Sequence, residues 1–136
     1  MSGLDKKRFS KNMNKLKVRI QKGMAEGTKV FAEELKTIIL ARTAKGRGVN
    51  GPFKKYTKKY AELKGDSTVN LRRTGDMLDA MKVKKNNKNS YTIGFSNKKE
   101  ENKAGHVGKK RPFMGANETE WKKLKKRFGK TFKRYL

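Results

Sequence analysis

Apolar side chains recur every three or four residues through the first third of the chain. The series consists of Phe9, Met13, Leu16, Ile20, Met24, Phe31, Leu35, Ile38 and Ile39. Steps of this size place the side chains along one side of an α-helix. The pattern predicts a helix over about residues 5–42, which at 1.5 Å per residue would be roughly 57 Å long.

A helix of that length does not fit inside its own domain. A compact chain of 136 residues has a radius of gyration near 14 Å, and hence a diameter of about 36 Å. Either Gly23 and Gly27 break the helix, at a cost of about 1 kcal/mol each relative to alanine, or one end projects and buries its apolar side on another subunit. We expect projection, with the two glycines as the place for a bend.

Shorter elements follow in the remainder of the chain. Residues 45–52, KGRGVNGP, are predicted to form a mobile surface loop, and they lack the spacing of a phosphate-binding P-loop. The next apolar residues, again three and four apart, predict a short helix that ends at Gly65. These residues are Phe53, Tyr56, Tyr60 and Leu63. We expect the tyrosines to pack in the core with their hydroxyls in water.

The stretch NLRRTGDMLDAM predicts a second short helix, with Thr74 as its N-cap and Asp76 in its first turn. Its apolar side consists of Met77, Leu78 and Met81. KVKKNNKNSYTIGF then predicts a β-hairpin with its turn at residues 86–89. Val83 lies on one arm, and Tyr91, Ile93 and Phe95 alternate on the other.

The last third of the chain contains few apolar residues before its final helix. Residues 96–110, SNKKEENKAGHVGKK, are predicted to form an exposed excursion. Asn117, followed three residues later by Glu120, is a variant of the helix capping box. It predicts a final helix whose apolar side consists of Trp121, Leu124, Phe128, Phe132 and Tyr135.

Together these elements predict an α+β fold in a single domain, residues 1–136. A long N-terminal helical segment spans residues 1–44, and an α+β body spans residues 45–136. The body holds short helices, a small and mostly antiparallel β-sheet with a hairpin, and a basic C-terminal helix.

The net charge of the chain constrains its partners. Thirty-eight Lys and Arg against twelve Asp and Glu give a formal net charge of +26, whereas small soluble domains usually carry about 2 to 8 charges. Such an excess predicts salt-sensitive attraction to polyanions and repulsion between copies. Candidate polyanion contacts surround the apolar side of the last helix: Lys122, Lys123, Lys125, Lys126, Arg127, Lys130, Lys133 and Arg134.

The sequence contains no helix-turn-helix, zinc-finger, RRM or KH signature. The aromatic residues of the last helix recur on a single side, as in a packed core. A non-specific nucleic-acid-binding basic protein is therefore the alternative function. The chain has no cysteine, no apolar run of about 18 residues and no secretory signal at its start, so we expect a soluble, intracellular protein.

Catalytic and metal-binding patterns are weak. His106 is the only histidine, and Glu100 and Glu101 near it lack metal-ligand spacing. No nucleophile and base signature accompanies it. Asp76 and Asp79 are explained by the dipole of the helix they begin. We predict no enzyme, no metal and no cofactor.

Four short motifs follow one another between about residues 50 and 125. They are Phe53, Tyr56, Tyr60 and Lys64; Leu71, Thr74, Gly75 and Leu78; Ala104, His106 and Gly108; and Arg111, Pro112, Phe113, Met114 and Gly115. In this order they resemble the tail-completion and virion-morphogenesis proteins of tailed bacteriophages, which include small neck and minor tail proteins. The chain departs from that family at Val107, where glutamine is frequent, and in the lysine-rich stretch before it.

The resemblance implies a structural virion protein without catalysis, assembled in the host cytoplasm and located in the neck or tail. It implies a homo-oligomer, a six-membered ring, between the tail tube and the head connector or portal-adaptor proteins, with DNA as a further, non-specific partner. The segment AGHVGKKRPFMG then becomes a shaped docking segment, whose glycines permit turns. The candidate oligomer and docking residues are Phe9, Met13, Leu16, Ile20, His106, Arg111, Pro112 and Phe113.

Overall fold

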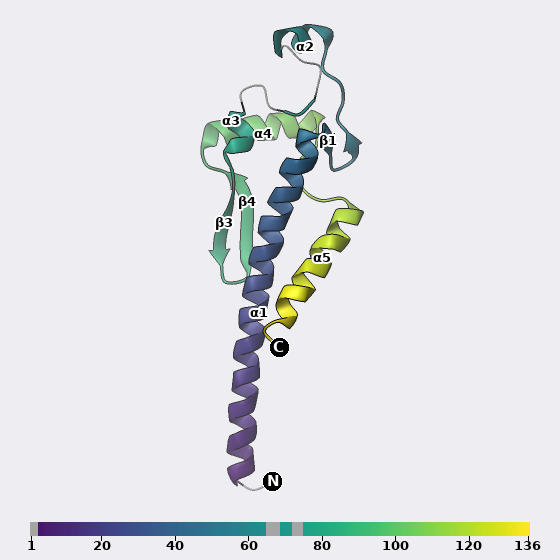
Figure 1. Cartoon of the computed structure of the whole chain (residues 1–136). Coiled ribbons are helices and arrows are strands. Elements are labelled where there is room, and N and C mark those ends of the chain that lie inside the picture. Colours follow the sequence, from purple (N-terminus) through teal and green to yellow (C-terminus); the bar gives the residue numbers. More distant parts are fainter. Residues whose placement is uncertain (1–2, 65–68, 72–74) are drawn as a thin grey trace.

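The computed structural model describes residues 3–64, 69–71 and 75–136. Helix α1 (Gly3–Ala44) is continuous over 42 residues, and its first half projects away from the rest of the molecule (Figure 1). Every side chain from Asp5 to Lys22 is exposed. The predicted projection is confirmed, whereas the helix continues without a break through Gly23 and Gly27.

The packing of α5 (Glu118–Lys133) explains the two glycines. A Cβ atom at Gly23 would come within 2.8 Å of the Phe132 ring, and one at Gly27 within 2.7 Å of the Phe128 ring. Because positions 23 and 27 of α1 carry no side chain, the two helices approach closely there. The packing of the two rings offsets the helix cost of glycine. The glycines are therefore contact positions in an antiparallel pair of helices (Figure 1).

The start of α5 confirms the predicted capping box. The Asn117 side chain accepts a hydrogen bond from the Glu120 backbone N–H at 2.9 Å, and the Glu120 carboxylate accepts one from the Asn117 backbone N–H at 3.0 Å. Farther along the helix Leu124 is completely buried. The capping box therefore fixes where α5 begins, and its apolar residues determine which side packs on α1.

The hairpin also forms as predicted. β3 (Met81–Asn87) pairs antiparallel with β4 (Ser90–Phe95), with Val83 opposite Ile93, and the hairpin lies beside α1 (Figure 1). In the segment predicted as a loop, β1 (Arg47–Gly48) pairs with β2 (Gly51–Pro52). Among the described residues the sheet is thus two separate antiparallel pairs of strands.

Helix α2 (Lys58–Lys64) is shorter than predicted. The Thr57 hydroxyl accepts a hydrogen bond from the Tyr60 backbone N–H at 3.2 Å, so it caps the helix and sets its start. Phe53 precedes this start and is buried in the core instead. Gly65, the predicted end of the helix, lies outside the described residues.

Helix α3 (Asp76–Asp79) is a single turn that follows Gly75, whose φ of 82° suits glycine. Met81 was predicted to belong to this helix, but it is the first residue of β3, where it is buried opposite Phe95. Thr74, the predicted N-cap, lies outside the described residues.

Residues 96–110, predicted as an exposed excursion, are mostly exposed, but they are not an excursion from the fold, because most of them form helix α4 (Lys98–Lys110). The Asn97 side chain caps its first turn by accepting a hydrogen bond from the Glu100 backbone N–H at 2.9 Å. Lys109 and Lys110 lie in the last turn, where positive charge stabilises the helix dipole. The buried Ala104 and the partly buried Val107 attach this polar helix to the core.

The core lies where the second half of α1 meets the hairpin, α3 and α4. Its buried members are Ile39, Phe53, Val69, Met77, Leu78, Met81, Phe95, Ala104 and Phe113. The predicted α+β architecture, with a long first helix, a hairpin, short helices and a basic last helix, is confirmed. None of the described helices is both long and apolar enough to cross a membrane.

Candidate assembly interface

The projecting half of α1 carries an apolar stripe that no described residue covers. This bare stripe consists of Phe9, Met13, Leu16 and Ile20, together with Met24 just beyond the projecting half. These side chains are 38–58% exposed. Apolar residues scattered singly over a surface are ordinary, but a row of them along one side of a helix is typical of a contact surface. Four of the five were predicted as docking residues from the sequence.

The bare stripe continues the surface of α1 to which α5 binds. Phe9, Leu16 and Gly23 follow one another at intervals of seven residues, and Met13, Ile20 and Gly27 do the same. Seven residues make almost two helical turns, so each series stays on one side of the helix with a drift of about 20° per step. The rings of α5 cover the glycine end of both series, and the other end is open to solvent.

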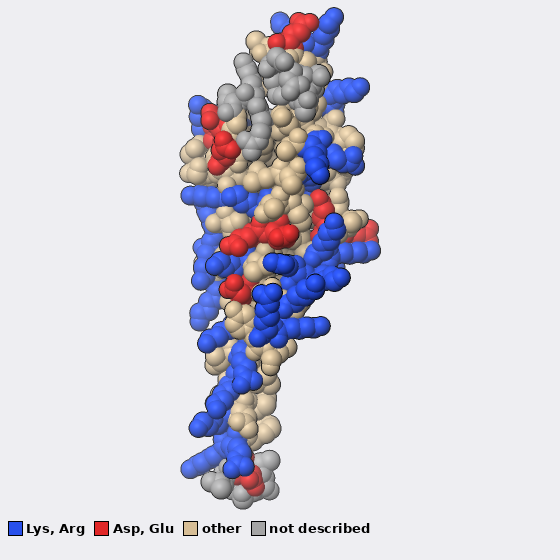
Figure 2. Space-filling view, in the orientation of Figure 1, with Lys and Arg blue, Asp and Glu red and all other residues tan. Residues whose placement is uncertain are grey.

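Charge is unevenly distributed along α1. Residues 3–22 contain eight Lys or Arg and one Asp, whereas residues 23–44 contain three basic and three acidic residues. Lys17 and Arg19 flank the bare stripe, one on each side. In Figure 2 the projecting helix accordingly has a blue side and a tan side. A surface that covers the bare stripe therefore meets positive charge at its rim.

The outer side of α5 is strongly basic. All eight of its predicted polyanion contacts are exposed: Lys122, Lys123, Lys125, Lys126, Arg127, Lys130, Lys133 and Arg134. Trp121 is 44% exposed, and it packs edge-to-face on Phe31 with ring centroids 5.2 Å apart. The aromatic residues of α5 thus contact α1 at least in part, while its lysines and arginines remain in solvent (Figure 2).

The predicted docking segment AGHVGKKRPFMG has a different form from the one expected. Its Gly105 and Gly108 lie within α4 and make no turn. Phe113 is completely buried in the core of its own chain, which removes it from any outer surface. Pro112 is exposed, and its carbonyl accepts a hydrogen bond from the Val49 backbone N–H at 3.0 Å. Much of the segment therefore packs within its own chain.

An arginine that the sequence did not single out connects α1, α5 and the segment after α4. Arg42 is buried, and it donates hydrogen bonds to the carbonyls of Phe113 at 2.7 Å and Gly115 at 2.6 Å. It also forms an ion pair with Glu120, the residue that completes the capping box. These three acceptors are at least 71 residues away in the sequence, and no local pattern connects them.

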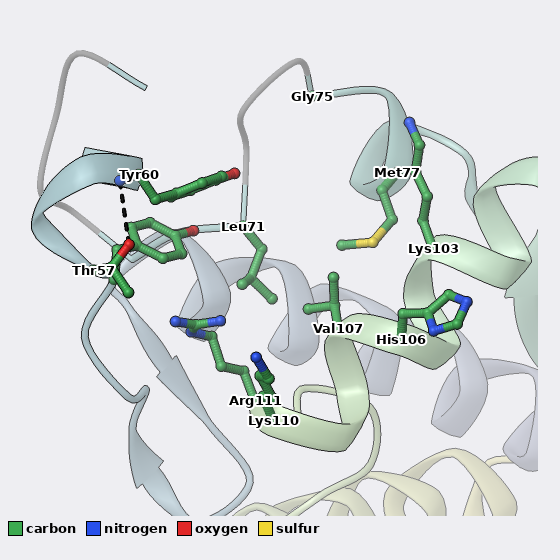
Figure 3. Close-up of a pocket in the computed structure, with 11 residues that line it drawn as sticks. Thr57, Tyr60, Leu71, Gly75, Met77, Lys103, His106, Val107, Lys110 and Arg111 are labelled. Carbon is green, nitrogen blue, oxygen red and sulfur yellow. Dashed lines mark hydrogen bonds between the residues drawn. The ribbon is translucent and has the colours of Figure 1, made fainter. Parts of the chain in front are cut away.

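Two further docking candidates, His106 and Arg111, line a cavity of about 680 Å³ between α2, α3 and α4, which we call the tyrosine pocket (Figure 3). Arg111 donates to the Lys54 carbonyl at 2.8 Å, and its guanidinium lies 4.7 Å from the Tyr56 ring centroid. Burial raises the pKa of the Tyr56 hydroxyl above its usual value of 10.0, although a backbone hydrogen bond from Leu71 acts in the opposite direction.

The described residues include no group of three or more His, Cys, Asp or Glu side chains that could hold a metal ion. Asp76 begins the single turn of α3, where its carboxylate stabilises the helix dipole, and Asp79 ends that turn. His106 is exposed on α4. The arrangement offers contact surfaces: an apolar stripe, a basic helix face and a cation-rimmed pocket.

Comparisons with protein-family models, with curated proteins and with solved structures find no match to this chain.

Proposed function

We propose that this protein is a structural subunit of a tailed-phage virion. In this proposal it is a neck or tail-completion protein that oligomerises into a ring and joins the tail to the head connector. The bare stripe on the projecting half of α1 is the observation that carries the proposal. The order of motifs that resembles the tail-completion proteins supplies the virion context.

The exposed apolar surface of the bare stripe favours assembly. Burial of such surface stabilises a contact by about 25 cal/mol per Å². The body of the same chain does not cover the part of the bare stripe within residues 5–22, because α1 carries these residues clear of it (Figure 1). A neighbouring subunit or an adjoining virion protein is therefore the proposed cover.

Two substitutions on the projecting helix test the proposal. Leu16→Asp places a carboxylate in the bare stripe, and Val18→Asp places the same charge about 200° around the helix. Leu16 is 38% exposed and Val18 is 48% exposed, so neither change should disturb the fold. We expect mass photometry at moderate salt to find oligomers of the unchanged chain and of Val18→Asp, and monomers of Leu16→Asp. Monomers of the unchanged chain at every salt concentration would contradict the proposal.

The net charge of +26 sets a condition for the ring. Copies repel one another, so assembly is expected to require salt, an acidic partner surface or DNA inside the ring. Oligomers of the purified chain should become more abundant as ionic strength rises. An increase in oligomers on lowering the salt, with no polyanion present, would exclude this account of the charge.

A second candidate function is non-specific nucleic-acid binding, which the exposed basic side of α5 favours. A DNA titration at about 50 and 200 mM NaCl separates the two, because an interaction made of six to ten phosphate contacts weakens roughly 10³- to 10⁵-fold over that range. Dedicated binding persists at the higher salt. An incidental polycation releases the DNA there.

A further inference from the structure

We propose that the tyrosine pocket binds an acidic peptide segment of a partner protein. The pocket would receive one large apolar side chain of that segment, and its rim would bind the flanking carboxylates. This site is separate from the bare stripe, and the inference does not depend on the proposed virion role.

The interior of the tyrosine pocket is apolar. Leu71, Met77 and Val107 converge on it from three different segments (Figure 3), and the rings of Tyr56 and Tyr60 form one wall, with their centroids 4.6 Å apart. Its volume of about 680 Å³ lies within the usual range for binding pockets, about 300–1,000 Å³. It is therefore large enough for a phenylalanine or leucine side chain.

The rim of the tyrosine pocket is cationic. Lys110 is exposed on α4 beside it, and the Arg111 guanidinium also lines it. Lys103 also lines it, and its ammonium group lies 3.3 Å from the Glu100 carboxylate. No described residue that lines the pocket is acidic. Charge complementarity therefore selects an occupant with carboxylates around its apolar group.

One wall of the pocket is held in shape before anything binds. Arg111 is fixed by the carbonyls of Lys54 and Lys55, at 2.8 and 3.3 Å, and it covers the Tyr56 ring. A preorganised wall lowers the entropic cost of binding.

The same geometry makes the Tyr56 ring a poor stacking surface for a nucleobase. Stacking of a base requires an open ring face, but the Tyr56 ring is already in contact with the Arg111 guanidinium, 4.7 Å away, and with the tilted Tyr60 ring, 4.6 Å away. An aliphatic or phenyl side chain needs only apolar contact, which the interior provides.

The experiment uses the full chain and two fluorescein-labelled peptides, one with a phenylalanine flanked by two glutamates on each side, and one with serine in place of the phenylalanine. Fluorescence anisotropy is measured in about 150 mM NaCl, where the Debye length is about 8 Å. We expect the phenylalanine peptide to bind at least tenfold more tightly, because the pocket removes the apolar surface of its side chain from water.

Two adjacent lysines provide the matched variants. Lys110 lines the pocket and Lys109 does not, yet both are exposed in the last turn of α4. Lys110→Glu and Lys109→Glu change the charge of the chain and of the helix end equally. We expect Lys110→Glu to weaken binding of the phenylalanine peptide at least tenfold more than Lys109→Glu does.

Three results would overturn the inference: equal affinities for the two peptides, equal losses in the two variants, or displacement of the peptide by an oligothymidine whose own binding is weakened more by Lys110→Glu than by Lys109→Glu. The last result would assign the pocket to nucleic acid. Because mass photometry of the Leu16→Asp variant reports on a different surface, failure of the pocket and failure of the proposed assembly are distinguishable.

Discussion

The two halves of α1 belong to one helix but differ in what surrounds them. Residues 23–44 are electrically balanced and lie against α5 and the hairpin, whereas residues 5–22 are strongly basic and exposed throughout. The apolar repeat is the same in both halves. An apolar helical pattern therefore identifies the side of a helix that will be buried. It does not indicate whether the surface that buries it belongs to the same chain.

The largest difference between the halves is expected at their arginines. Arg42→Ala leaves Glu120 and two carbonyls without their donor, and loss of one partner of a buried ion pair costs about 3–5 kcal/mol. Arg19→Ala, in the exposed half, should change the free energy of unfolding by less than about 0.5 kcal/mol. Urea denaturation of both variants measures the difference, and similar effects would refute the role given to Arg42.

The isoleucines give a second matched pair. Ile39 is completely buried, and Ile20 is 39% exposed. Ile39→Ala should lower the free energy of unfolding by about 2–5 kcal/mol, because it opens a cavity in the core. Ile20→Ala should change it by no more than about 0.5 kcal/mol in the monomer. A large effect of Ile20→Ala in dilute monomeric protein would mean that residues 5–22 fold back onto the body.

Replacing a glycine at the boundary between the halves with alanine should change the stability by a smaller amount. The change should destabilise the protein, whereas alanine in place of glycine usually stabilises a helix. Alanine normally stabilises a helix by about 0.5–1 kcal/mol relative to glycine. At Gly129 of α5, where a Cβ atom would meet nothing within 4 Å, we expect that gain. At Gly27 the same change forces the Phe128 ring aside and should cost about 1–3 kcal/mol. Thermal melts followed by circular dichroism compare the two variants, and a stabilising Gly27→Ala would disprove close packing at this point.

Elements with a local signature were predictable from the sequence. The periodic side chains of α1, the Asn117 and Glu120 capping box and the alternation in β4 each reside in a few neighbouring residues. Helix α4 was missed because its apolar content is small, although Asn97 before Glu100 was a usable signal of its start.

The remaining features depend on contacts between distant segments. Glycine in a helix has a penalty visible from the sequence alone, but the rings of Phe128 and Phe132 that make Gly23 and Gly27 favourable come from the other end of the chain. The three acceptors of Arg42 and the walls of the tyrosine pocket are also far apart in the sequence. The periodicity of apolar residues carries no information about such long-range contacts.

The continuity of α1 also gives the molecule a fixed span. The helix is unbroken from Ile20, in the exposed stretch, to its end at Ala44. This distance corresponds to roughly 36 Å at 1.5 Å per residue. The glycines along this span, its natural points of flexure, are clamped under phenylalanine rings. The helix therefore acts as a stiff spacer. A molecule bound at one end is held at a set distance and orientation from a molecule bound at the other end.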